Sequence, residues 1–148
     1  MNCLELITDI IKIEAYDFKE ITFSVPFTHD MAIESSSVSF SGTPVVVSMK
    51  ENSAEARTTL STNDAGDLYE NTLSWKTDDN LPETLRQVGS LSASRKHYLI
   101  TTYDGTRKLV YNWIGIGRTK PDASISGSEE TISMSFKVSG RIPILTLL

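Results

Sequence analysis

Cysteine is almost absent from this chain of 148 residues, since Cys3 is the only one. A single cysteine excludes a disulfide within one chain and any metal site built from several cysteines. This usage favours folding in an intracellular compartment, because disulfides stabilise mainly secreted proteins.

Long apolar runs are also lacking, and we expect no signal peptide. Residues 1–13 contain no basic region, and Glu5 and Asp9 interrupt their apolar side chains. No apolar run approaches the roughly 20 residues that a membrane span needs. We therefore expect a soluble protein, made in a cytoplasm, with no membrane partner.

Groups that usually carry chemistry are scarce as well. The two histidines, His29 and His97, have no partner at metal-ligand spacing, and we expect His97 at the surface of a strand. The stretch 115–117, Gly-Ile-Gly, lacks the third glycine of a dinucleotide-binding fingerprint, and no serine lies in a GxSxG elbow. Asp78 and Asp79 fit a helix cap better than a metal pair. We expect neither an enzyme nor a cofactor or metal site.

Positive charge is scarce in the first part of the chain. Residues 1–80 hold 14 acidic and 5 basic side chains, a net charge of −9, whereas residues 81–148 hold 5 and 9, a net charge of +4. The whole carries −5, with 39% hydrophobic and 22% charged residues, as in an ordinary single domain. This division would orient head-to-tail association if the two halves formed two surfaces. Equally, halves of a sequence need not be halves of a molecule.

The strongest structural signal is a hairpin over 98–111. Its strands, 98–103 and 106–111, flank Asp104-Gly105, which is typical of a two-residue type I′ turn. Such a loop predicts the cross-strand pairs Tyr98–Tyr111, Ile100–Leu109 and Tyr103–Thr106. One face would carry Tyr98, Ile100, Leu109 and Tyr111, and the other Leu99, Thr101, Lys108 and Val110. Both faces hold apolar residues, so we expect the hairpin to be covered on both sides near its base.

Residues 131–138 alternate between apolar and polar side chains without interruption. The pattern predicts a strand with one buried and one wet face. The buried face would carry Ile132, Met134, Phe136 and Val138, and the wet face Thr131, Ser133, Ser135 and Lys137.

The first half of the chain is less clear. Residues 3–16 admit either a short helix or a strand, and residues 19–28 predict a strand at a sheet edge, because Pro26 cannot donate a hydrogen bond to a ladder. We expect a long loop or extended arm over about 28–66, with strands at 45–49 and, as an option, at 57–60. A further strand is expected at 67–77.

The best helix prediction covers about 80–92. Leu81, Leu85 and Val88 have helical spacing, Pro82 suits the first turn, and Asp79 or Asn80 can cap it. Beyond the hairpin, residues 112–117 continue or bend the strand, and 118–127 are expected as a polar connection.

The segment 141–148 is an apolar tail, which we expect to dock on its own domain or on a neighbour. If the tail docks on a neighbour, it forms a subunit interface. The candidate interface residues are Ile142, Ile144, Leu145, Leu147 and Leu148.

Basic and aromatic residues are interleaved around the hairpin, as in surfaces that stack nucleic-acid bases. The candidate nucleic-acid-facing residues are Arg95, Lys96, Arg107, Lys108, Arg118 and Lys120, with Tyr98, Tyr103, Tyr111 and Trp113 among them. The negative net charge favours the alternative that the aromatics build a core and the basic residues give solubility.

The last third resembles the small β-sandwich proteins of bacteriophage tail tubes, head-tail necks and baseplates, of the kind encoded by phages and prophages of Bacteroidetes-type hosts. The similarity rests on the hairpin 98–111, the segment 113–118 and the strand 130–143. It implies a virion structural protein, assembled in the host cytoplasm. Its partners would be copies of itself in a hexameric or dodecameric ring, other virion proteins, and DNA passing through the channel.

We therefore expect a mainly β single domain, 1–148, built as an antiparallel β-sandwich or partly closed barrel of about seven strands with one short mid-chain helix. An alternative function is a small β-barrel binding module for a ligand or single-stranded nucleic acid. The expected core comprises Ile21, Phe23, Val25, Leu73, Trp75, Leu85, Val88, Ile100, Leu109, Ile132, Met134 and Phe136.

Overall fold

The computed structural model describes residues 2–17, 19–24, 31–63, 66–77, 82–93, 96–110, 122–128, 131–140 and 143–148. Sheet A is antiparallel, with the strand order β1 (Asn2–Ile7), β7 (Glu55–Asn63), β8 (Gly66–Thr77), β12 (Thr131–Gly140) and β11 (Asp122–Ser128). Sheet B has the order β4 (Ala32–Ile33), β13 (Leu145–Leu147), β10 (Arg107–Val110), β9 (Lys96–Thr102), β2 (Ile10–Asp17) and β6 (Val45–Val46). Only its β13–β4 pair is parallel.

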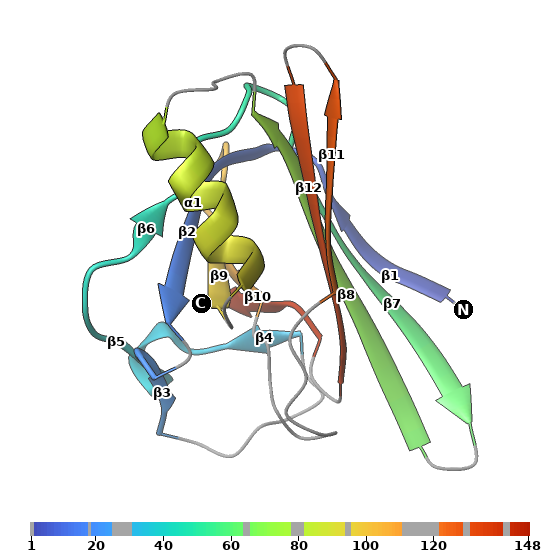
Figure 1. Cartoon of the computed structure of the whole chain (residues 1–148). Helices are drawn as coiled ribbons and strands as arrows, with labels where there is room; N and C mark the ends of the chain where they lie inside the picture. The colour runs from blue at the N-terminus through green and yellow to red at the C-terminus, as the bar shows by residue number, and fades with distance from the viewer. Residues whose placement is uncertain are drawn as a thin grey trace.

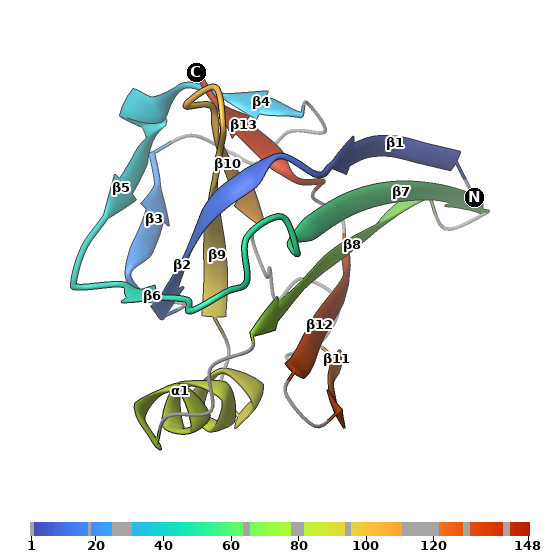
Figure 2. The same ribbon diagram turned by 90° about the horizontal axis from the view of Figure 1, so that it is seen from above.

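Two small elements and one helix complete the fold. Strands β3 (Ile21–Phe23) and β5 (Val38–Phe40) form an antiparallel ribbon, and a 3-10 turn at Ser35–Ser37 comes directly before β5. Helix α1 (Pro82–Ala93) lies across one open side between the two large sheets (Figures 1 and 2). The prediction of a mainly β, antiparallel sandwich with one short helix is confirmed, although the described residues form thirteen strands and no closed barrel.

Sheet B is the middle of three layers. In Figure 2 the β3–β5 ribbon, sheet B and sheet A follow one another from left to right. The central strand β9 of sheet B is therefore buried on both faces, which explains why Tyr98, Leu99 and Ile100 are consecutive apolar residues, each 2% exposed or less. The expectation that the hairpin is covered on both faces is confirmed.

The main core fills the space between sheets A and B. Trp75 and Leu73 on β8 lie opposite Met134 and Phe136 on β12, and all four are buried. The Trp75 and Phe136 rings stack with centroids 5.4 Å apart. The alternation predicted for 131–138 is confirmed where side chains are described, because Lys137 is exposed and Ile132 is partly buried.

A second core lies between sheet B and the β3–β5 ribbon. Ile21 on β3 and Val38 on β5 pack with Leu99, Leu109 and other residues of sheet B. Phe23, expected in the core, is only partly buried there, and Val25 lies outside the described residues. Phe40 contacts the Tyr16 ring, with centroids 5.1 Å apart.

The predicted hairpin register is wrong by one residue. Leu109 lies opposite Leu99, Lys108 opposite Ile100 and Val110 opposite Tyr98. The loop has three residues, 103–105, with Gly105 at φ 88° and its N–H donating to the Thr102 carbonyl at 3.0 Å. A type I turn followed by a left-handed residue gives this geometry, and it places Leu109 on the face opposite to the predicted one.

The N-terminal segment, for which helix and strand were both open, forms two strands in different sheets. β1 joins sheet A, and β2 joins sheet B after the two connecting residues Thr8 and Asp9. The β1–β7 register shifts between Cys3 and Glu5, which marks a bulge.

The long loop expected over 28–66 contains regular structure. β4 and β5 lie within it, so the loop prediction is wrong for their residues. The nine-residue strand β7 includes the optional strand at 57–60. β6 covers only 45–46 of the strand expected at 45–49. The prediction of a polar connection at 118–127 is also wrong from Asp122 onward, because β11 begins there. β8 confirms the strand expected at 67–77.

Helix α1 confirms the predicted element but not its buried face. Leu85 is 47% exposed, whereas Leu91 is 1% exposed and belongs to the main core. The Gln87 side chain connects the helix to the end of β6 and to the chain after it: its Nε2 donates to the Val46 carbonyl at 3.0 Å, and its Oε1 accepts from the Ser48 N–H at 2.9 Å. Val88 is a residue whose side chain is not described.

Candidate functional site

The predicted basic cluster does not come together among the described residues. Lys96 begins β9, at the end of the hairpin remote from its turn, and Arg107 begins β10 beside the turn. Arg107 and Lys108 are adjacent in β10 and so point to opposite faces of sheet B. The Arg107 guanidinium lies over the Phe40 ring, 5.5 Å from its centroid. Arg95, Arg118 and Lys120 lie outside the described residues.

Lys108 is engaged inside the protein. Its Nζ lies 2.8 Å from Oε2 of Glu5 and 2.8 Å from Oγ1 of Thr146, and its side chain is only 13% exposed. This position, between β1 and β13, is unsuited to contact with a phosphate backbone.

Of the predicted aromatic set, the structure describes Tyr98 and Tyr103, and these two do not form a common surface. Tyr98 is a core residue, 2% exposed, and burial raises the pKa of its hydroxyl. Within the described ranges Tyr103 is the exposed candidate, at 82% in the hairpin turn, and Tyr111 and Trp113 lie outside those ranges. The described part of the chain therefore gives no support to a nucleic-acid platform.

The C-terminal tail is an internal strand. β13 lies between β10 and β4, and Ile144, Leu145 and Leu147 are at most 8% exposed within their own domain. These three side chains are buried in the chain's own cores and are not available to a neighbour. The expectation that they form a subunit interface is therefore wrong. Leu148 is 63% exposed, and Ile142 lies outside the described residues.

His97 is buried at 1% exposure, which makes the expectation of a surface histidine wrong. It lies in β9, the central strand of a sheet that is covered on both faces, opposite Tyr16. No group of three or more His, Cys, Asp or Glu side chains suited to a metal ion occurs in the described ranges.

The outer face of sheet A is rich in hydroxyl groups, with its described charges mostly paired. Arg57 lies 3.2 Å from Glu55, and Lys137 lies 3.3 Å from Glu70. This face also carries Thr59, Thr72, Ser74, Lys76, Ser133 and Ser135, on the opposite side from the buried residues of the same strands.

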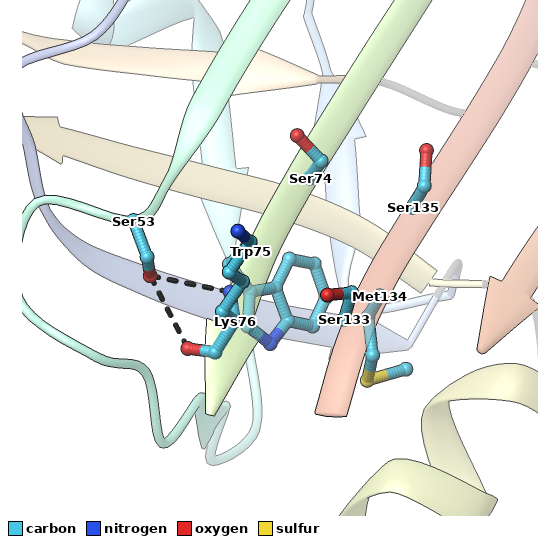
Figure 3. A pocket seen from close by; sticks show the side chains of 7 residues that line it. All are labelled: Ser53, Ser74, Trp75, Lys76, Ser133, Met134 and Ser135. Atoms are coloured by element: carbon cyan, nitrogen blue, oxygen red, sulfur yellow. Dashed lines mark hydrogen bonds between the residues drawn. The ribbon is translucent and has the colours of Figure 1, made fainter. Parts of the chain in front are cut away.

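A shallow hollow of about 220 Å³ lies on this face, where Ser74 of β8 and Ser135 of β12 are paired (Figure 3). Ser53 closes one side, because its Oγ lies 3.2 Å from both the N–H and the carbonyl oxygen of Lys76. The hollow is smaller than the roughly 300–1,000 Å³ of typical small-molecule sites.

A larger hollow of about 600 Å³ lies beside β2. It is bounded by Ile10, Ile11, Val47, Ser48, Met49, Glu51, Asn52 and Tyr103. Of these, only Tyr103 was considered as a binding residue from sequence. The others carry no motif, and only the folded chain brings 10–11, 47–52 and 103 together.

Comparison of the chain with protein-family models, with curated proteins and with solved structures gives no match. No helix in the described part of the chain is long and apolar enough to cross a membrane.

Proposed function

We propose that this protein is a virion structural subunit that forms oligomeric rings around the DNA channel of a phage tail or head-tail connector. The proposal rests mainly on the observation that sheet A, within the described ranges, is not closed into a barrel and so has two edges. Its edge strands, β1 and β11, have no second strand partner among the described residues. Pairing β1 of one copy with β11 of the next would close a ring and remove both edges.

The exposed residues of β1 support a contact at this edge. Leu4 and Leu6 are 41% and 50% exposed. Soluble proteins commonly protect such edges with charged side chains, whereas these positions are apolar. β1 and the adjoining parts of β7 and β8 also extend beyond sheet B (Figure 2), where a neighbouring subunit can reach them.

The outer face of sheet A suits the lining of a channel. Its hydroxyl groups and its two charge pairs offer DNA little net attraction, and Lys76 is the one cation on this face without a salt bridge to a described residue. DNA adheres to surfaces that present unpaired Lys and Arg, so a face of this kind lets it pass.

The test is electron microscopy of the full chain, with light scattering after size-exclusion chromatography. We expect rings, and we expect the double variant Leu4→Lys/Leu6→Lys to remain folded by circular dichroism but monomeric. Leu85→Lys, on the exposed face of α1, is the matched control and should still assemble. The proposal would be refuted if the wild-type chain stayed monomeric at its solubility limit and also when mixed with the other virion proteins of the phage that encodes it.

A further inference from the structure

The first residues of β2 form an open stretch of sheet edge. β9 pairs with β2 from Ile10 onward, whereas β6 pairs only with Glu14 and Ala15. The Val47 N–H donates to the Ile13 carbonyl at 2.9 Å, after which the chain leaves β2. In the described residues, 10–12 therefore have a strand on one side only, and an exposed edge can accept an added strand.

The 600 Å³ hollow runs along this open edge. Ile10 and Val47 form a buried apolar floor, at 3% and 6% exposure, and Met49 is partly buried. Ile11 and Tyr103 stand at the rim, 55% and 82% exposed. The volume is in the range of ligand sites, and an exposed tyrosine offers a large contact area at a low cost in conformational entropy.

Acidic residues outnumber unpaired basic ones in and next to the segments that line the hollow. Glu51 lines the hollow, Asp9 precedes Ile10, and Asp104 follows Tyr103. The Tyr103 N–H donates to the Asp9 carbonyl at 2.8 Å, which holds the turn against the start of β2. Lys50 is the cation beside Glu51, and Lys12 is already paired with Glu14 at 3.7 Å. Three carboxylates against one lysine favour a cationic partner.

We propose that this hollow is a docking site for an extended, cationic peptide segment. Its backbone would lie along residues 10–12 of β2, a bulky apolar side chain would enter the hollow beside Tyr103, and a lysine or arginine would lie near Glu51. The proposal does not depend on ring formation, because β2 belongs to sheet B and the proposed ring contacts belong to sheet A.

The experiment is selection of a random peptide library against the immobilised full chain, followed by affinity measurement with the best synthetic peptide. Enriched sequences should carry net positive charge together with bulky apolar residues. Tyr103→Ala should weaken binding by about 5- to 30-fold, as for a moderate interface hot spot. Glu51→Gln should weaken it by roughly 2- to 5-fold, with a smaller effect at high salt.

Two controls separate this site from other surfaces. Leu85→Ala removes an exposed leucine outside the hollow and should leave the affinity unchanged, and so should Leu4→Lys/Leu6→Lys. No enrichment, enrichment of acidic peptides, or binding insensitive to both Tyr103→Ala and Glu51→Gln would overturn the proposal. Self-association of the chain that Tyr103→Ala abolishes would also overturn it, since the occupant would then be a second copy.

Discussion

The Nζ atom of Lys108 in β10 lies 2.8 Å from Oε2 of Glu5 in β1, so one ion pair joins sheet B to the edge strand of sheet A. Lys108→Met would leave the Glu5 carboxylate, 24% exposed, without its cationic partner. We expect the free energy of unfolding to fall by about 1–3 kcal/mol, because the partly buried Glu5 carboxylate loses its ion pair with Lys108. Urea denaturation measures the change.

The surface pair Arg57–Glu55, with side chains 48% and 46% exposed, is the matched control. Arg57→Met should change the free energy of unfolding by less than about 0.5 kcal/mol, since exposed pairs contribute little. Equal losses in the two variants would contradict the importance of burial for the Lys108 pair.

Leu91 and Leu85 are on the same helix but in opposite environments. Leu91→Ala should lower the free energy of unfolding by about 2–4 kcal/mol, because it leaves a cavity in the main core. Leu85→Ala, at an exposed helix position, should change it by less than about 0.5 kcal/mol. Thermal and urea unfolding of both variants check this, and a larger effect at Leu85 would mean that α1 packs by its other face.

Asp104 gives the hairpin turn a dependence on pH. The Thr102 hydroxyl, 2.5 Å from Oδ1, and the Thr106 N–H, 2.9 Å from it, hold the pKa of Asp104 at about 2, below its usual 3.8. Because folding lowers this pKa, the ionised Asp104 carboxylate stabilises the folded state. Its contribution is fully present above about pH 4 and is lost as the pH falls toward 2.

Replacing Asp104 with Asn should therefore flatten the change in melting temperature between pH 4 and pH 2. Thr102→Val removes the larger cause, so the Asp104 pKa measured by NMR should rise toward 3.8. An unchanged pKa in this variant would show that the Thr102 hydroxyl is not responsible.

Removal of β13 should abolish the fold rather than assembly alone. Deleting 145–148 takes away a strand paired with both β10 and β4, together with the buried Leu145 and Leu147. We expect the truncated chain to lose its dispersed NMR spectrum. Leu148→Ala keeps the backbone bonds between Leu148 and residues 33 and 35 and should fold normally. A well-folded truncation would contradict the internal role of β13.

Elements with a clean hydrophobic period could be predicted from sequence. β8 and β12 each bury one face, so Trp75 and Phe136 were identifiable as core residues. β7 was predicted only in part because Thr58, 0% exposed, is a polar residue on its buried face. Thr58 is compatible with burial because its hydroxyl lies 2.9 Å from the Asn71 amide oxygen.

The hairpin register could not be fixed from its turn residues. Asp104-Gly105 suits a two-residue loop, but Gly105 with positive φ also serves a three-residue loop, and the hydrogen bonds of Asp104 stabilise the latter. His97 was misplaced because a strand covered on both faces has no wet side for a polar residue. The larger hollow had no signal in the sequence, since its three segments meet only through tertiary contacts.

The position of β13 between β4 and β10 has a consequence for synthesis. β4, residues 32–33, has only β13 as its neighbour in sheet B, and β13 emerges from the ribosome roughly 110 residues later. At about 5–20 residues per second the delay is on the order of 5 to 20 s. During that time the apolar face of the β3–β5 ribbon lacks part of its cover, and the same holds for β10 from its own synthesis until β13 follows. The nascent chain therefore passes through a stage at which chaperone binding would protect it from aggregation.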